Sequence, residues 1–198
     1  MIEIAENVYQ IPLLPRNAIN AYLIGSVLID SGIGWSGKRI LAAVDGRYIT
    51  AHALTHAHPD HLGSSAVICN QLEVPLWCGE ADRALAERDT GMPAARVLGN
   101  GDIVEGFQVL ETPGHTPGHI AFWRESDRVL IAGDVVLNMN LLTTVSGLGE
   151  PLKRFTADVE ENRRSIKRIA VLAPNVMGVG HGPPVYGPED LLALASRC

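Results

Sequence analysis

The segment 54–63, L-T-H-A-H-P-D-H-L-G, places three histidines and an aspartate within six positions. Such groups are costly to bury unless they are paired or bind a metal. The apolar stretch over 49–54 predicts a buried strand that leads directly into the segment. Pro59 has no amide proton and a fixed φ, so the strand has to end near His58. The chain must therefore fold so that a strand end presents this cluster.

The local geometry of the segment favours a metal site. His56 and His58 stand two residues apart, which on extended chain directs both imidazoles to one face. Asp60 and His61 follow at the expected start of a helix, where an aspartate is favourable. Nitrogen and oxygen donors of this kind suit zinc or a similar divalent metal. His52, inside the strand, is interpreted instead as a structural residue.

Three other motifs offer further ligands at expected strand ends. T-P-G-H-T-P-G-H over 112–119 forms a sharp loop with His115 at its tip, and His119 opens the next strand. Asp134 follows an apolar strand in I-A-G-D-V, and His181 follows another in G-V-G-H-G-P-P. With the first segment this makes seven candidate ligands, five histidines and two aspartates. Such a set suits two metals that share one bridging carboxylate.

The pattern of apolar residues predicts a layered α/β fold. Strands are expected at 8–11, 18–24, 27–30, 49–54, 74–77, 107–111, 119–123, 129–132 and 176–179. Helices are expected at 37–44, 62–72, 80–88, 156–169 and 189–195. Hairpins come first and helix-separated strands later, which favours sheets covered by helices. The sequence shows no linker, so we expect one domain over residues 1–198.

Composition limits the partners of the protein. The formal net charge is −6 and no run of Lys or Arg is present, which argues against nucleic acid. No apolar run approaches the roughly 20 residues of a membrane helix, and the N-terminus does not resemble a signal peptide. Cys69, Cys78 and Cys198 form no recognisable pairing pattern, which fits a reducing compartment. We expect a cytoplasmic protein acting on a small molecule, its oligomeric state left open with a homodimer as one option.

The motif H-x-H-x-D-H at 56–61, followed in order by His115, Asp134 and His181, resembles the metallo-β-lactamase superfamily. The resemblance implies an αββα sandwich that holds two divalent metal ions, with zinc preferred and iron or manganese as alternatives. It assigns the ligands as His56, His58 and His115 for the first metal, Asp60, His61 and His181 for the second, and Asp134 as the bridge.

The resemblance also implies a reaction. A hydroxide between the metals would attack a carbonyl, and Asp60, the one catalytic residue assigned, would orient that hydroxide and take its proton. The histidine segments are typical of the glyoxalase II-like branch, so the leading hypothesis is a binuclear hydrolase of a thioester, lactone or related ester-like bond. A mononuclear iron oxidoreductase resembling persulfide dioxygenases, and a phosphodiesterase, remain open.

Several residues are expected to surround the ligands. The apolar segment 137–149 predicts a pocket wall in which Met139, Leu141 and Leu142 prefer an apolar acyl group. A buried helix or a dimer contact is an equal alternative for this segment. Trp35, in a glycine-rich loop, is a second pocket candidate. Asp30 and His119 are expected to orient the ligands from behind.

Overall fold

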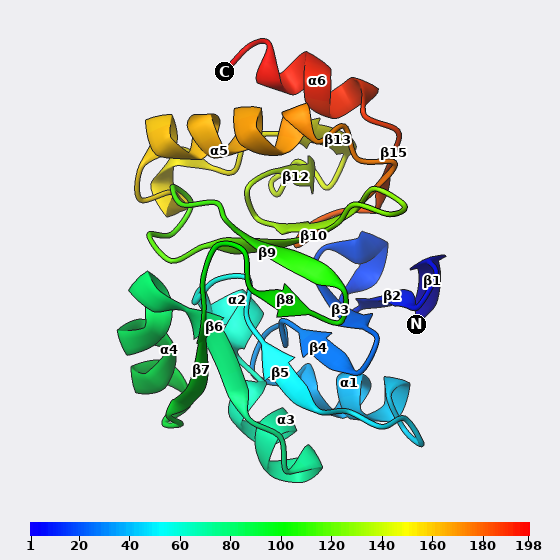
Figure 1. The fold of residues 1–198 in the computed structure, drawn as a ribbon, viewed down its shortest axis with the longest axis vertical. Helices are drawn as coiled ribbons and strands as arrows, with labels where there is room; N and C mark the ends of the chain where they lie inside the picture. The colour runs from blue at the N-terminus through cyan, green and yellow to red at the C-terminus, as the bar shows by residue number, and fades with distance from the viewer.

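Two β-sheets pack face to face and helices cover their outer faces (Figure 1). The computed structural model describes residues 1–198. This architecture is an αββα sandwich, which confirms the fold expected from the sequence. The metal-ligand candidates lie at one edge of the sandwich, where strands of both sheets end.

The first sheet has seven strands that follow one another in sequence order. They are β1 (Ile2–Ala5), β2 (Val8–Pro12), β3 (Asn20–Ile24), β4 (Val27–Ile29), β5 (Ala51–Ala53), β6 (Leu76–Gly79) and β7 (Ala94–Leu98). The strands β1 to β4 are antiparallel, whereas β4 to β7 run parallel. Parallel strands need crossovers, and these contain the helices α1 (Gly37–Ala43), α3 (Ser65–Leu72) and α4 (Arg83–Thr90).

The second sheet has six strands in the order β15-β14-β11-β10-β9-β8. They are β8 (Ile103–Val104), β9 (Phe107–Glu111), β10 (Ile120–Arg124), β11 (Val129–Gly133), β14 (Val176–Val179) and β15 (Val185–Tyr186). Only β11 and β14 pair in parallel, and α5 (Val159–Val171) lies in the connection between them. The last helix, α6 (Glu189–Ala195), packs on α5.

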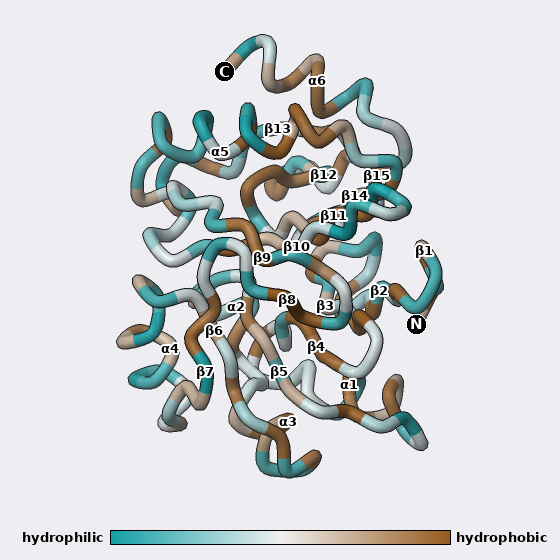
Figure 2. Tube along the Cα trace, viewed as in Figure 1, coloured by the Kyte–Doolittle hydropathy of each residue, from teal (hydrophilic) through white to brown (hydrophobic).

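Three apolar clusters fill the three interfaces between the layers. One lies between the sheets, one between the first sheet and its helices, and one between the second sheet and α5 and α6. Strand β10 shows how the sequence produces them, because its side chains alternate between two interfaces. Ile120 and Phe122 face the first sheet, whereas Ala121 and Trp123 face the helices. Figure 2 shows apolar residues along these strands in brown.

Helix boundaries differ from the sequence expectation where side chains or backbone contacts decide them. The helix expected over 156–169, with Asp158 or Thr156 as its start signal, is α5, and it begins after Asp158, whose carboxylate accepts a hydrogen bond from the amide of Glu161 at 2.9 Å. The helix expected over 62–72 is divided into α2 (Pro59–Leu62) and α3. The division falls at Gly63 and Ser64, and an added Cβ at Gly63 would lie 2.7 Å from the amide of Gly34, so this close approach requires a glycine.

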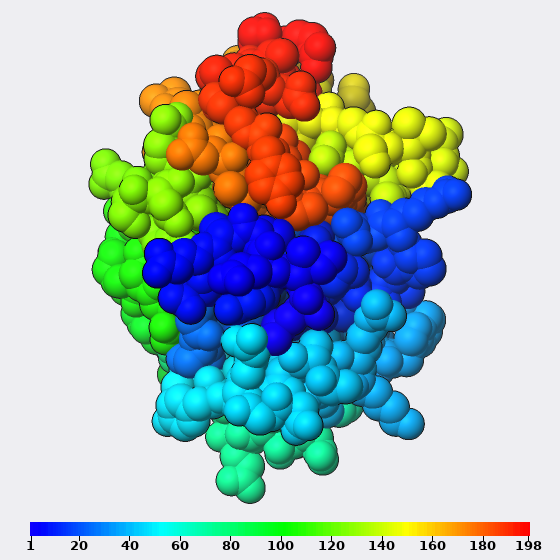
Figure 3. Space-filling model, turned by 90° about the vertical axis from the view of Figure 1, so that its right-hand side faces the viewer, coloured from blue at the N-terminus to red at the C-terminus, as the bar shows by residue number.

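The segment 137–149 forms a separate hairpin of β12 (Leu137–Met139) and β13 (Ser146–Gly149), neither of which the sequence predicted. Its tip is tied to the N-terminal part of the chain, because Arg16 donates a hydrogen bond to the Thr144 hydroxyl at 2.7 Å. Figure 3 shows the blue N-terminal segment beside this yellow part of the chain. All helices are too short or too polar to cross a membrane.

Candidate metal centre

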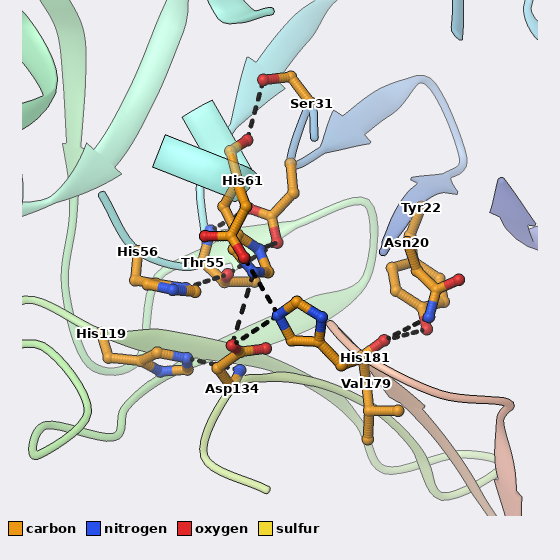
Figure 4. A network of polar contacts seen from close by, with 12 residues as sticks. Asn20, Tyr22, Ser31, Thr55, His56, His61, His119, Asp134, Val179 and His181 are labelled. Atoms are coloured by element: carbon orange, nitrogen blue, oxygen red, sulfur yellow. Dashed lines mark hydrogen bonds and ion pairs between the residues drawn. The ribbon is translucent and has the colours of Figure 1, made fainter. Parts of the chain in front are cut away.

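Five segments bring the seven candidate ligands to one edge of the sandwich. The loop after β5 carries His56 and His58, and α2 carries Asp60 and His61. The β9–β10 loop, the end of β11 and the end of β14 supply the other three, His115, Asp134 and His181. Figure 4 shows dashed lines that join His61 and His181 to the carboxylate of Asp134. Side chains more than a hundred positions apart in the sequence therefore meet.

Asp134 lies at the centre of the cluster. Its Oδ2 atom is 3.2 Å from Nε2 of His181 and 3.6 Å from the Nε2 atoms of both His61 and His115. Nε2 of His181 also lies 3.3 Å from Oδ2 of Asp60. Three overlapping groups have all their ligand atoms within 4.8 Å of one another: His56, His58 and His115; His56, His61 and Asp134; and Asp60, His61 and His181. This spacing is short enough for neighbouring metal ions that share a ligand.

Unpaired polar atoms in the cluster fit metal binding. Nε2 of His56, His61 and His115 and Oδ1 of Asp134 are buried and make no hydrogen bond. Buried polar atoms normally have a partner, so four such atoms facing one another call for an explanation. A divalent cation satisfies all of them, since imidazole nitrogen and carboxylate oxygen are its usual ligands.

Hydrogen bonds behind the histidines turn their Nε2 atoms inward (Figure 4). The Thr55 hydroxyl donates to Oδ2 of Asp30 at 2.8 Å and therefore accepts from Nδ1 of His56 at 3.0 Å. Nδ1 of His61 donates to the same carboxylate oxygen at 2.8 Å. Nδ1 of His181 donates to the carbonyl of Ala18 at 2.5 Å. Each bond fixes the ring nitrogen that carries hydrogen, which leaves the other free for a metal.

His119 supports the central carboxylate in a different way. Its Nε2 accepts a hydrogen bond from the backbone amide of Asp134 at 3.1 Å, so Nδ1 carries the hydrogen and donates to Thr112 at 2.8 Å. The structure thus places both Asp30 and His119 behind ligands, where the sequence expected them. His52 lies outside the cluster, between the Leu28 carbonyl and the Ser65 hydroxyl.

The histidines fall into two electrostatic classes. Burial lowers the pKa of His115 to about 4 and also lowers the pKa values of His56 and His58, which keeps these imidazoles neutral. Burial has the same effect on His181, but the charge of Asp134 and the hydrogen bonds to Asp134 and Asp60 outweigh it and raise the pKa of His181 to about 10. Asp134 and Asp30 likewise hold the pKa of His61 well above its usual value. The carboxylate side of the cluster therefore attracts positive charge, which a metal ion can supply in place of protons.

Asp82 joins two of the ligand loops, and sequence reasoning missed it. This buried aspartate accepts hydrogen bonds from the amide of Ala57 at 2.9 Å, the hydroxyl of Thr116 at 2.6 Å and the amide of Gly118 at 2.8 Å. Ala57 lies between His56 and His58, whereas Thr116 follows His115. One carboxylate thus holds together loops from different sheets. Nothing around Asp82 in the sequence, G-E-A-D-R, marks it as part of a site.

Other supporting residues were missed because their partners are distant in sequence. Asn20 donates to the carbonyls of Val179 and Gly182, and Tyr22 donates to Val179 at 2.8 Å, so β3 holds the loop of His181 (Figure 4). A Cβ at Gly180 would collide with Oδ1 of Asp134 and approach Cε1 of His61 to 2.6 Å. The G-V-G-H-G motif contained a signal for this glycine, since backbone beside a site often requires one.

The expected pocket residues occupy different positions around the cluster. A cavity of about 330 Å³ reaches His58, Asp60, His115, Asp134 and His181, and Leu141 is part of its wall. Met139 is buried and lines a neighbouring cavity instead. Leu142 and Trp35 are 73% and 77% exposed and belong to neither lining, because their side chains point to solvent.

Comparisons with known proteins agree with this geometry. Residues 14–181 match the family model described as "Metallo-beta-lactamase superfamily". The probable metallo-hydrolase YflN of Bacillus subtilis is 29% identical over 86% of this chain and 81% of its own length. The crystal structure of TTHA1623 in a di-iron-bound form is 31% identical, covers 96% of this chain and 97% of that one, and superposes with a TM-score of 0.72.

A hydroxyacylglutathione hydrolase of Bdellovibrio bacteriovorus is 30% identical over 65% of this chain. The match spans 47% of that enzyme, so about half of its length has no counterpart here. The family model covers far more than half of this chain and includes all seven candidate ligands. This chain belongs to the metallo-β-lactamase superfamily, whose members are generally metallohydrolases.

Proposed function

We propose that this protein is a binuclear metallohydrolase that cleaves a thioester, a lactone or a related ester-like bond in a small molecule. The observation that carries the proposal is the set of unpaired Nε2 and Oδ1 atoms around Asp134, which borders an apolar cavity. No serine or cysteine lines that cavity, so it offers no side-chain nucleophile of the usual hydrolases. Water is then the nucleophile that the cluster serves.

We propose the ligand assignment that the motif order implies. His56, His58 and His115 hold one ion, Asp60, His61 and His181 hold the second, and Asp134 lies between them. The first group is neutral and the second carries the carboxylate charge, so the second site binds a divalent ion with more charge compensation. Zinc suits these donors, and the di-iron form of TTHA1623 keeps iron a candidate beside manganese.

When bound, divalent ions supply acidified water and polarise a carbonyl oxygen. The side chain of Asp60 is 37% exposed and lines the cavity. Although burial opposes it, hydrogen bonding to His181 lowers the pKa of Asp60 to about 2. Its carboxylate can therefore accept a hydrogen bond from water and orient it, but it is a weak base near neutral pH. The orienting role fits Asp60 better than that of proton acceptor.

We also propose that the protein works in a reducing compartment such as the cytoplasm, without a nucleic-acid partner. Its three cysteines are unpaired, and the formal net charge is −6. A glutathione thioester is a less suitable substrate than an uncharged one. The cavity contains no Lys or Arg that would bind the carboxylates of glutathione.

The test is a substrate screen on protein with measured metal content. The protein is purified without added metal, quantified, stripped with a chelator and reloaded with zinc, iron or manganese. We expect two equivalents of metal and hydrolysis of esters, thioesters or lactones. The Asp134→Asn variant should lose both the bound metal and the hydrolysis. Asp102→Asn, in the turn between β7 and β8, is the matched control. One equivalent of iron with oxygen uptake on a persulfide would contradict the proposal.

A further inference from the structure

We propose that the acyl part of the substrate is an uncharged hydrocarbon chain, which runs from the metal cluster past Leu141 into a second cavity. This inference rests on the proposed hydrolase function and specifies its substrate class. It starts from the walls of the two cavities that adjoin the β12–β13 hairpin.

The cavity at the cluster adjoins a larger one. The first has a volume of about 330 Å³, and the second, under the hairpin, has about 540 Å³. Leu137, Leu141 and Leu152 line both, so they lie where the two cavities meet. Both volumes fall within the range of small-molecule sites, and an elongated ligand can occupy the two together.

Apolar surface makes up most of the walls of both cavities. Beside the ligands, the first is lined by Ile33, Leu137, Leu141, Pro151, Leu152 and Phe155. The second adds Met139, Val145 and Leu148, beside the polar side chains of Asn140, Thr143, Ser146 and Glu150. The apolar parts of these walls favour methylene groups, because a polar group placed against them would lose its hydration without gaining a hydrogen bond.

The charges in the walls exclude an anionic chain. Neither lining contains Lys or Arg. The only charged residue added by the second cavity is Glu150, whose carboxylate pairs with Arg163 at 2.9 Å. A chain that ends in a carboxylate would therefore meet apolar side chains and acidic groups but no free cation.

A further depression beside the cluster differs in charge from the two cavities, which sets the proposed orientation of the substrate. His58, His115 and Phe155 also border a depression that contains Arg154, whose guanidinium lies 4.6 Å from the centre of the Phe155 ring. This depression contains a cationic side chain, whereas the linings of the two cavities beside the hairpin contain none. The leaving group therefore lies toward Arg154, and the hydrocarbon chain lies toward Leu141.

A chain-length series tests the inference on metal-loaded protein. With p-nitrophenyl esters from butanoyl to dodecanoyl, kcat/KM should rise roughly three- to fourfold per added methylene until the cavities are filled. Esters with a terminal carboxylate on the acyl chain should show no such increase in kcat/KM with chain length. A flat profile, or equal rates for charged and uncharged chains, would overturn the acyl-chain assignment and leave the hydrolase proposal standing.

Leu141 and its neighbour Leu142 form a matched pair for mutation. Leu141→Trp fills the junction and should shift the chain-length optimum of kcat/KM to shorter esters. Leu142→Trp changes an exposed side chain outside both linings and should match the unmodified protein. Leu152→Trp repeats the test from the opposite wall if Leu141→Trp does not fold. Identical chain-length profiles in all variants would refute the path past Leu141.

A binding measurement separates the two proposals. N-phenyl-1-naphthylamine, an uncharged probe that fluoresces in apolar sites, is bound to metal-free protein and displaced with primary alcohols. Longer alcohols should displace it at lower concentration, and Leu141→Trp should remove this dependence. If no ester is hydrolysed but the dependence is seen, the hydrolase proposal fails and the chain site stands. If esters are hydrolysed but displacement of the probe does not depend on alcohol length, the chain site fails.

Discussion

The carboxylate of Asp82 accepts a hydrogen bond from the backbone amide of Ala57 at 2.9 Å, and Ala57 is the residue between the ligand candidates His56 and His58. The same carboxylate binds Thr116 and Gly118 in the loop of His115. The three histidines of the first metal group therefore share one anchor, although they come from different sheets.

Asp82→Asn should weaken the first metal site. Asparagine has a single acceptor oxygen, so either Ala57 or Gly118 loses the acceptor for its amide. Replacing residues that orient ligands typically costs 10- to 100-fold in metal affinity. Competition with a chromophoric chelator measures this loss, and the cobalt(II) absorption spectrum reports the ligand geometry. Asp102→Asn is the control, and unchanged affinity and spectrum in Asp82→Asn would show that Asp82 is structural only.

Gly180→Ala should disturb the central carboxylate. The new methyl group collides with Asp134 and approaches the His61 ring to 2.6 Å, so the carboxylate or the backbone has to move. We expect weaker metal binding and a loss of about 1–3 kcal/mol in the free energy of unfolding, as for other overpacked sites. Chelator competition and urea unfolding measure the two effects. Gly99→Ala, whose Cβ would meet only Glu111 at 3.7 Å, should change neither.

His52 should make the protein less stable in acid. Burial lowers its pKa to about 4 from an unfolded value of about 6.5. Between these values the unfolded chain binds a proton that the folded protein does not, so stability is complete above pH 6.5 and falls as the pH drops to about 4. Over this pH range the titration of His52 lowers the free energy of unfolding by roughly 3 kcal/mol.

The His52→Asn variant isolates this contribution. Urea unfolding of metal-free protein across the same pH window should give a shallower loss of stability in the variant. The other buried histidines are present in both proteins and cancel in the comparison. Parallel curves for the two proteins would mean that His52 is protonated in the folded state.

Only Cys198 should react with thiol reagents in the native protein. Cys69 and Cys78 are buried, and burial raises the pKa values of their thiols to about 12 and about 11, so they form almost no thiolate near pH 8. Cys198 is only partly buried. Ellman's reagent should titrate one thiol in the native protein, none in Cys198→Ser, and three in urea for the unmodified chain. Rapid reaction of Cys69 or Cys78 would show that the core opens locally.

Sequence periodicity predicted a layered α/β architecture and most of its strands and helices, whereas the arrangement of two sheets back to back was implied by the family resemblance. Alternation in β10 and the amphipathic pattern of α5 follow from local side-chain geometry, which is the same in every fold. Short or polar strands such as β1, β7 and those of the β12–β13 hairpin were not predicted, because they are strands through tertiary pairing rather than through their own composition.

The seven candidate ligands were also visible in the sequence, since metal ligands are few in type and closely spaced in the histidine segment. Of the residues behind them, Asp30 and His119 were expected, whereas Asp82 and Asn20 were not. Asp82 and Asn20 act through partners on distant segments, and their own neighbours in the chain carry no trace of the contact. Leu141 and Leu142 are adjacent leucines that the sequence could not distinguish, yet one lines the cavities and the other faces solvent. The chemistry of side chains thus determined what this protein can bind, whereas packing between distant segments decided which residues support the site, because a contact depends on where the chain has been brought together.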